Sequence, residues 1–121
     1  MKILVAEDDA IMLASITHML KQEGFTVTAA NNGREAMQIF ETDIPDLIIT
    51  DIMMPFTSGL DFLNIIRNNS NKIPVIVLSA VDEENTVLEA FNLGADDFLI
   101  KPVKPGELSV RVNRLLKRSK Q

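Results

Sequence analysis

The sequence contains no cysteine and only one histidine, His18, and these two scarcities remove several classes of functional site. Without cysteine the chain can form neither a disulfide nor a thiolate metal site, and it has no thiol nucleophile; such a chain is compatible with a reducing compartment. His18 has no second histidine or cysteine with which to complete a metal site of that kind. It also falls outside the apolar stripe of its expected helix, so we expect a solvated side chain rather than a ligand or phosphodonor.

Long apolar runs and basic clusters are also scarce. The longest apolar run is far shorter than the roughly 18 residues of a membrane-spanning helix, and Met1-Lys2 leads directly into an expected strand without a signal peptide. The net charge of −5 argues against a nucleic-acid surface, which needs clustered positive charge. We therefore expect a cytoplasmic domain that binds neither nucleic acid nor membrane directly. The one basic cluster suits the C-terminal end of a helix and consists of Arg111, Arg114, Lys117, Arg118 and Lys120.

Short apolar segments alternate with helical patterns along the whole chain. With 121 residues, 46% of them hydrophobic, and no break in composition, a single domain over 1–121 is expected. The patterns predict strands over 3–6, 25–29, 47–49, 75–78 and 98–100. Helices are expected over 10–23, after Asn31-Asn32-Gly33, after Ser58-Gly59, from an Asp82 cap to 92, and from Pro105 onward. The helix ending at 92 has only a thin apolar stripe, formed by Val87, Leu88 and Phe91.

Five strands that alternate with five helices predict a doubly wound α/β fold, with helices on both faces of a parallel sheet. The favoured strand order is 2-1-3-4-5, which is that of the flavodoxin-like three-layer sandwich. This order places the first and third strands side by side at the switch point of the sheet, where α/β proteins of this kind bind ligands.

The stretch from Asp46 to Pro55 contains the central strand of this arrangement. Its apolar run at 47–49 is typical of a strand buried on both faces, and the strand delivers Asp51 to its carboxyl end. Because parallel strands end at the same edge, the residues that follow the inner strands should meet there. They are Glu7 and Asp8 after the first, Asp51 after the third, Ser79 after the fourth and Lys101 after the fifth.

This set of side chains predicts a site for a hard cation. Two carboxylates about 4 Å apart repel by roughly 4 kcal/mol at an effective dielectric constant near 20, so three of them favour a bound cation. Oxygen ligands without histidine or cysteine select Mg²⁺ before Ca²⁺. The alternative reading treats these acids as helix caps and exposed loop ends. It fits Asp9, which can cap the first helix, and stays open for Glu7.

At this point the sequence resembles the receiver domain of bacterial two-component response regulators, the CheY-like superfamily. The resemblance covers the whole chain in order. It rests on Ile-Leu-Val-Ala-Glu-Asp-Asp at 3–9, Pro-Asp-Leu-Ile-Ile-Thr-Asp-Ile-Met-Met-Pro at 45–55 with Gly59, Pro-Val-Ile-Val-Leu-Ser-Ala at 74–80, and Gly-Ala-Asp-Asp-Phe-Leu-Ile-Lys-Pro at 94–102.

The resemblance implies that Asp51 accepts a phosphoryl group from the phosphohistidine of a sensor kinase or phosphotransfer protein. Mg²⁺, or Mn²⁺ in its place, would be held by Asp8, Asp51 and the Met53 backbone carbonyl, with Glu7 acting through water. Phosphate oxygens would be bound by Lys101, Ser79 and the backbone N–H of Ala80. The resemblance also implies a cis peptide between Lys101 and Pro102. The resemblance implies a chain that would not be a conventional enzyme but would catalyse its own Mg²⁺-dependent phosphorylation from a phosphodonor and its own dephosphorylation.

The implied output is conformational. Ser79 would move toward the phosphoryl group and Phe98 would turn inward, which remodels the face formed by the helix ending at 92, the strand at 98–100 and the last helix. Phe98 replaces the commoner Tyr, so a hydrogen bond of that hydroxyl is lost. An output domain or a separate effector would read this face. Asp97, Glu107 and Arg111 occupy positions through which related receivers dimerise, whereas Val87 and Glu89 depart from that pattern and leave dimerisation open.

Three other functions are compatible with parts of the pattern. A haloacid-dehalogenase-like phosphatase needs a second acid two residues after the first, where this chain has Met53. A flavodoxin needs a phosphate-binding loop after the first strand, where Glu7, Asp8 and Asp9 would repel phosphate. A pseudo-receiver that acts as a constitutive interaction module should lack Asp51, Asp8 or Lys101, and all three are present.

Overall fold

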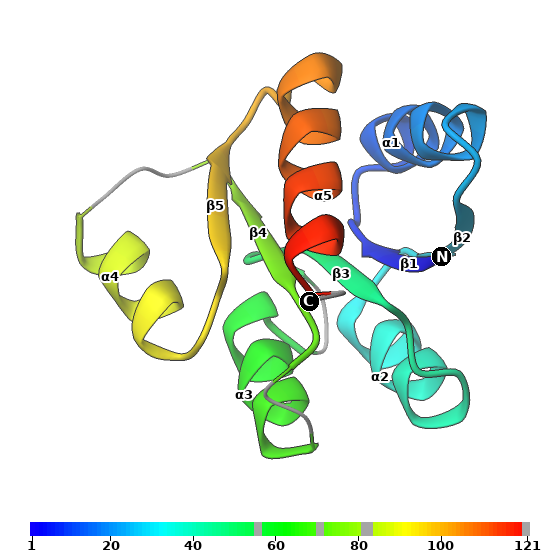
Figure 1. Ribbon diagram of the computed structural model, residues 1–121. Coiled ribbons are helices and arrows are strands. Elements are labelled where there is room, and N and C mark those ends of the chain that lie inside the picture. Colours follow the sequence, from blue (N-terminus) through cyan, green and yellow to red (C-terminus); the bar gives the residue numbers. More distant parts are fainter. Residues whose placement is uncertain (55–56, 70–71, 81–83, 120–121) are drawn as a thin grey trace.

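The computed structural model describes residues 1–54, 57–69, 72–80 and 84–119. Within these ranges one parallel sheet of order β2-β1-β3-β4-β5 alternates with helices along the chain (Figure 1). The strands are β1 (Lys2–Ala6), β2 (Thr26–Ala30), β3 (Leu47–Asp51), β4 (Val75–Ser79) and β5 (Asp97–Ile100). The helices are α1 (Ala10–Gln22), α2 (Gly33–Thr42), α3 (Gly59–Asn69), α4 (Glu84–Asn92) and α5 (Pro105–Ser119). The predicted flavodoxin-like α/β fold and its strand order are confirmed.

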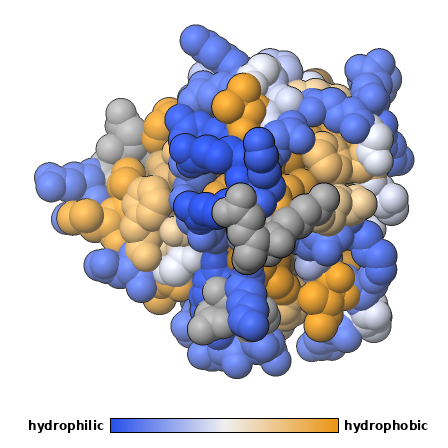
Figure 2. Space-filling view, in the orientation of Figure 1, coloured by the Kyte–Doolittle hydropathy of each residue, from blue (hydrophilic) through white to orange (hydrophobic). Residues whose placement is uncertain are grey.

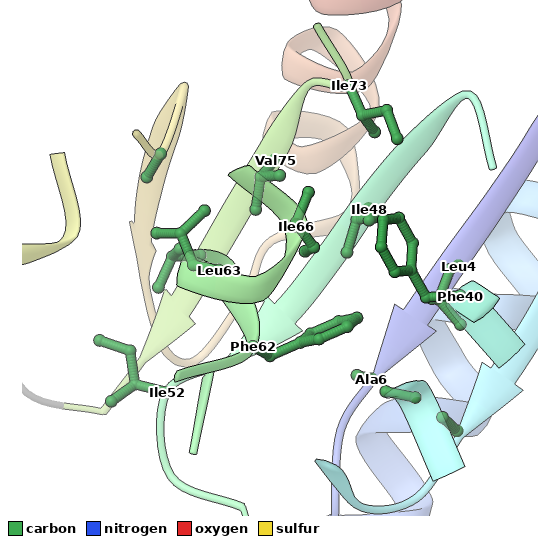
Figure 3. Close-up of a cluster of buried hydrophobic side chains, with 14 of the residues drawn as sticks. Leu4, Ala6, Phe40, Ile48, Ile52, Phe62, Leu63, Ile66, Ile73 and Val75 are labelled. Atoms are coloured by element: carbon green, nitrogen blue, oxygen red, sulfur yellow. The ribbon is translucent and has the colours of Figure 1, made fainter. Parts of the chain in front are cut away.

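Alternate residues of the central strands enter two separate cores. Ile3 and Val5 of β1 pack with α1 and α5, whereas Leu4 and Ala6 pack with α2, α3 and α4. In the core that contains Leu4 and Ala6, Figure 3 shows Phe40 of α2 and Phe62 of α3 on the same side of β1 and β3. Their rings meet edge to face, with centroids 6.1 Å apart. The inner strands are therefore buried on both faces, as their apolar sequences predicted.

The expected helix starts are confirmed for three helices. The Asp9 carboxylate accepts hydrogen bonds from the backbone N–H groups of Ile11 and Met12, and Asn32 accepts one from Glu35 at the start of α2. The Ser58 hydroxyl oxygen accepts a hydrogen bond from the backbone N–H of Asp61 at the start of α3. These contacts satisfy N–H groups that have no partner within a helix. The predicted Asp82 cap lies outside the described residues, as does Pro55. In the described part of the chain, no helix combines the length and apolar character required to cross a membrane.

Two expectations need correction. Strand β2 begins at Thr26 instead of residue 25, because the N–H of Phe25 bonds to the Leu20 carbonyl and closes the end of α1. In α4 the inward residue is Ala90, whereas Leu88 and Phe91 of the predicted stripe are 51% and 44% exposed. A short helix at the edge of the sheet needs only a small residue at its contact, so its larger apolar side chains lie outside.

The three arginines of α5 pair with acids that precede and begin β5. Arg111 donates two hydrogen bonds to the Asp97 carboxylate, at 2.7 and 2.8 Å, and Arg114 approaches the same group at 3.3 Å. Arg118 pairs with Asp96 at 3.4 Å. These arginines therefore do more than complement the dipole of their helix, because their ion pairs connect α5 to the start of β5.

Arg67, near the C-terminal end of α3, joins two chain segments at the amino ends of the strands. Its guanidinium donates to the carbonyls of Gly94 and Ile73, at 2.6 to 2.9 Å, and to the Asp96 carboxylate at 2.9 Å. The Arg67 side chain is only 15% exposed, so these acceptors have little water to replace it.

We expect Arg67→Met to lower the free energy of unfolding by about 2–4 kcal/mol, because two carbonyls lose the guanidinium that binds them and the Asp96 carboxylate loses the more buried of its two arginines. Arg118→Met is a matched control: it removes the other arginine that pairs with Asp96, but from an ion pair whose arginine side chain is 64% exposed. The control should cost less than about 1 kcal/mol. Urea unfolding of both variants measures the difference, and equal losses would contradict this role of Arg67.

Candidate functional site

The polar residues predicted to meet at one edge of the sheet do so at the carboxyl ends of the inner strands. Asp51 is the last residue of β3, and Ser79 is the last residue of β4. Glu7 follows β1 and donates its N–H to the Ala30 carbonyl at 3.0 Å. Lys101 follows β5, and its N–H bonds to the Ser79 carbonyl at 2.8 Å. The parallel register alone therefore collects residues separated by up to 94 positions.

The Lys101 ammonium occupies the centre of this group. Its Nζ lies 2.6 Å from Oδ2 of Asp51, 3.1 Å from Oε1 of Glu7 and 2.9 Å from Oε2 of Glu7. Glu7 has no exposed surface and Asp51 is 3% exposed. The alternative reading of Glu7 as an exposed loop end is therefore wrong. A single cation is shared by two buried carboxylates.

Asp8 completes a group of three acids. Glu7, Asp8 and Asp51 each offer a carboxylate oxygen, and these three atoms lie within 4.8 Å of one another. Asp8 is exposed, so the group is open to solvent on one side. Two of the three acids, Glu7 and Asp51, are buried. An all-oxygen donor set of three carboxylates fits a hard divalent cation.

The electrostatics of this group are unusual at Glu7. Burial raises the pKa of its carboxyl from 4.5 to about 7, against the opposing effects of hydrogen bonds from Lys101 and from the Asp9 N–H, and the Asp51 charge raises it further. For Lys101, burial lowers the pKa, but the hydrogen bonds to Asp51 and Glu7 outweigh it and raise the pKa above its usual value. Lys101 is therefore a permanent cation at neutral pH, whereas Glu7 changes charge there.

The other predicted residues lie at different distances from this centre. The Met53 side chain is 72% exposed and points away from the core, while its N–H approaches Oδ1 of Asp51 at 3.4 Å. Ser79 is buried, and Ala80 beside it is exposed. The peptide between Lys101 and Pro102 is cis, as the resemblance implied.

Phe98 is the one predicted residue that does not belong to the acidic edge. It is half-buried against the core beneath α4, and its ring lies 6.5 Å from that of Phe91, at an interplanar angle of 38°. Strand β5 and helix α4 thus meet through two aromatic rings.

Sequence reasoning missed two contacts that shape the site. A Cβ on Gly59 would meet the backbone carbonyl of Asp51, so only glycine lets α3 begin this close to the end of β3. The buried hydroxyl of Thr50 donates to the same carbonyl at 3.1 Å. Gly59 was recognised only as part of a motif, and no sequence signal marked Thr50.

Comparison with known proteins assigns the chain to a class. Residues 3–113 match the family model of the response regulator receiver domain. Among curated proteins, the chain is 39% identical over 127 residues to the alkaline phosphatase synthesis transcriptional regulatory protein SphR of Synechococcus elongatus. It is 36% identical over 118 residues to the regulatory protein PhoP of Bacillus subtilis. Each alignment covers 98% of this chain and 49% of the relative, so the chain spans about half the length of these proteins.

Solved structures agree with this assignment. The receiver domain of the Francisella response regulator 1452 superposes with a TM-score of 0.92 at 39% identity, and the alignment covers 98% of each chain. A CheY-like receiver domain protein from Methanospirillum hungatei gives a TM-score of 0.94 at 25% identity, over 98% of this chain and 95% of that one.

The chain therefore belongs to the response regulator receiver domain family of two-component signalling systems. Its fold and site are consistent with phosphorylation-dependent signal transduction. Receiver domains generally use Mg²⁺, and the three acids beside Lys101 form a group that could bind such an ion. This assignment separates the chain from the flavodoxin and phosphatase alternatives.

We expect the stability of the metal-free protein to depend on pH through Glu7. Because its pKa is about 7 when folded and 4.5 when unfolded, its stabilising contribution is complete below about pH 4.5 and is lost as the pH rises through about 7. Between about pH 6 and about pH 8, the wild type should lose about 1 kcal/mol of unfolding free energy relative to Glu7→Gln. Urea unfolding in the presence of a chelator measures this. Parallel pH profiles of the two proteins would refute the raised pKa of Glu7.

Proposed function

We propose that this chain is a phosphorylation-activated switch in which Asp51 accepts a phosphoryl group from a phosphohistidine of a sensor kinase or phosphotransfer protein. A carboxylate oxygen of Asp51 forms the new bond to phosphorus as the bond from phosphorus to the imidazole nitrogen breaks. The nitrogen keeps the electron pair, and the product is an aspartyl phosphate. Hydrolysis ends the activated state: water attacks the phosphorus, the bond from phosphorus to the Asp51 oxygen breaks, and the carboxylate is restored as inorganic phosphate leaves.

The observation that carries this proposal is the environment of Asp51. Its carboxylate is 3% exposed at the end of a buried strand, yet Oδ2 is held at 2.6 Å by Lys101 and two further acids lie within reach of one cation. Phosphoryl transfer needs alignment and neutralised charge more than acid–base groups. A fixed nucleophile, a permanent cation and a candidate metal site supply these requirements.

The residues proposed to hold Mg²⁺, or Mn²⁺ in its place, are Asp8, Asp51 and the backbone carbonyl of Met53, with Glu7 acting through water. When bound, the ion neutralises phosphoryl oxygens and offsets the repulsion between these carboxylates. The protein holds the ligand atoms in place. Burial restricts the carboxylates of Glu7 and Asp51, and Met53 lies two residues after the end of β3.

Lys101, Ser79 and the N–H of Ala80 are proposed to bind the phosphoryl oxygens. Lys101 already lies beside Asp51, so its ammonium can move from the carboxylate to a phosphoryl oxygen over a short path. Ser79 and Ala80 follow the neighbouring strand β4 at the same edge. Their hydroxyl and N–H would donate hydrogen bonds to the oxygens that Lys101 does not contact.

The output is proposed to pass through Ser79 and Phe98 to the face formed by α4, β5 and α5. Leu88, Phe91 and Ile100 are 41–51% exposed on this face, and Figure 2 shows apolar side chains on the surface over α4. The contact between Phe98 and Phe91 links the switch residue to this exposed group. A change in the Phe98 ring would therefore alter the surface that an output domain or effector meets.

The same face is proposed as the surface of a homodimer. Asp97, Glu107 and Arg111, the positions expected to form bridges between copies, are joined within one chain: Arg111 contacts Asp97 at 2.7 Å and Glu107 at 3.3 Å. A dimer of this kind would have to share or exchange these pairs, and exposed pairs contribute little individually. Residues 1–121 are proposed to form one receiver domain, as part of a longer transcriptional regulator or alone. A cytoplasmic location stays a prediction.

Phosphorylation from acetyl phosphate tests the proposal. We expect one phosphoryl group on the wild type in the presence of Mg²⁺, none without the ion and none on Asp51→Asn, because both the nucleophile and charge neutralisation are required. Asp61→Asn, which changes an exposed acid on α3, is the matched control and should be modified like the wild type. Intact-protein mass read within minutes measures all four conditions.

A wild type that stays unmodified requires a second measurement, since a small donor can react slowly. Beryllofluoride, a mimic of the phosphoryl group, should bind to the wild type in the presence of Mg²⁺. Failure of both reactions would favour the pseudo-receiver alternative, and modification of Asp51→Asn would assign the acceptor to another residue.

A further inference from the structure

Helix α2 contacts the segment that follows Asp51 through a glycine. Gly33, the first residue of α2, is buried, and a Cβ at this position would meet the backbone carbonyl oxygen of Thr57 and lie 2.6 Å from the Thr57 Cβ. Real side chains essentially never make contacts this close, so any larger residue would force the Thr57 backbone to move. The contact, and not a left-handed backbone conformation, explains the glycine here.

A second contact ties Thr57 to the same helix. The Thr57 hydroxyl donates a hydrogen bond to Sδ of Met37 at 3.4 Å. Met37 lies one turn after Gly33, on the same side of α2. A thioether sulfur is a weak acceptor, so the close approach at Gly33 contributes more to the placement than this bond does.

Gly59, two residues after Thr57, links Thr57 to the metal-binding edge. The Gly59 N–H donates a hydrogen bond to the Ile52 carbonyl at 2.7 Å. On its other side Gly59 already touches the end of β3, where a Cβ would lie 2.7 Å from the Ile52 Cα. A shift of Thr57 therefore displaces Gly59 and, through this contact, Ile52, the residue that precedes Met53.

We propose that Gly33 is a positioning residue for the metal site: by letting α2 contact Thr57, it sets where the Met53 backbone carbonyl lies. This inference rests on the proposed function, in which that carbonyl is a Mg²⁺ ligand. Gly33 itself touches neither the ion nor the phosphoryl group, and its effect is on metal affinity rather than on the nucleophile.

Gly33→Ala tests the inference, with Gly106→Ala as the matched control, because a Cβ on Gly106 has nothing within 4 Å. Titration of the isotope-labelled full chain with MgCl₂, followed by nuclear magnetic resonance, gives the dissociation constant for the metal alone. We expect Gly33→Ala to weaken Mg²⁺ binding by about tenfold, the lower end of the range for residues that orient metal ligands. Gly106→Ala should change it by less than about twofold.

A second readout separates positioning from a general loss of structure. The rate of phosphorylation by acetyl phosphate, measured against Mg²⁺ concentration, should be half-maximal at about tenfold more Mg²⁺ in Gly33→Ala. Its maximum at saturating Mg²⁺ should stay within about twofold of the wild type, since Asp51 and Lys101 are unchanged. A purely structural defect would lower the maximum and leave the Mg²⁺ affinity of the folded fraction unaltered.

Each outcome decides between the two proposals. If the wild type binds no Mg²⁺, the proposed metal site is wrong. If the wild type binds Mg²⁺ and folded Gly33→Ala binds it equally well, only the role of Gly33 is refuted. If circular dichroism shows that Gly33→Ala does not fold, Thr57→Gly decides: it removes both the hydroxyl that bonds to Met37 and the Cβ that lies against Gly33, and it should weaken Mg²⁺ binding by about tenfold. Unchanged binding in that variant would overturn the inference.

Discussion

The ammonium of Lys101 between Asp51 and Glu7 is the interaction on which the rest of the site depends. Two carboxylates at the end of a parallel sheet would repel each other strongly if nothing separated their charges. Lys101 lies 2.6 Å from one and 2.9–3.1 Å from the other, and its own charge is stabilised by both. The buried carboxylate of Asp51 is therefore paired with a cation that reaches it from a different strand.

This arrangement also explains the division of roles among the acids. Glu7 is fully buried and has a pKa of about 7, so its charge responds to the cations around it. Asp8 is exposed and gives the group its opening to solvent. Asp9, one residue further, turns away and caps α1. Three consecutive acids thus have three different environments, set by where β1 ends and α1 begins.

The sequence was sufficient to predict the strand order and the set of residues at the carboxyl edge, because both follow from the alternation of strands and helices and from parallel pairing. It was not sufficient where side-chain direction depends on packing between distant segments. The exposure of Leu88 and Phe91 depends on how α4 lies on the sheet, and the burial of Glu7 depends on Lys101. The contacts of Arg67 with Gly94 and Asp96 join segments whose proximity only the fold reveals.

The wide separation of the site residues along the chain has a consequence for signalling fidelity. Lys101 is 50 residues from Asp51 and 94 from Glu7, and the three come together only when β1, β3 and β5 are all in the sheet. In a nascent or misfolded chain the same acids and the same lysine are present but lie apart. The acidic group with its central cation therefore forms only together with the native sheet, and incompletely folded copies should lack it.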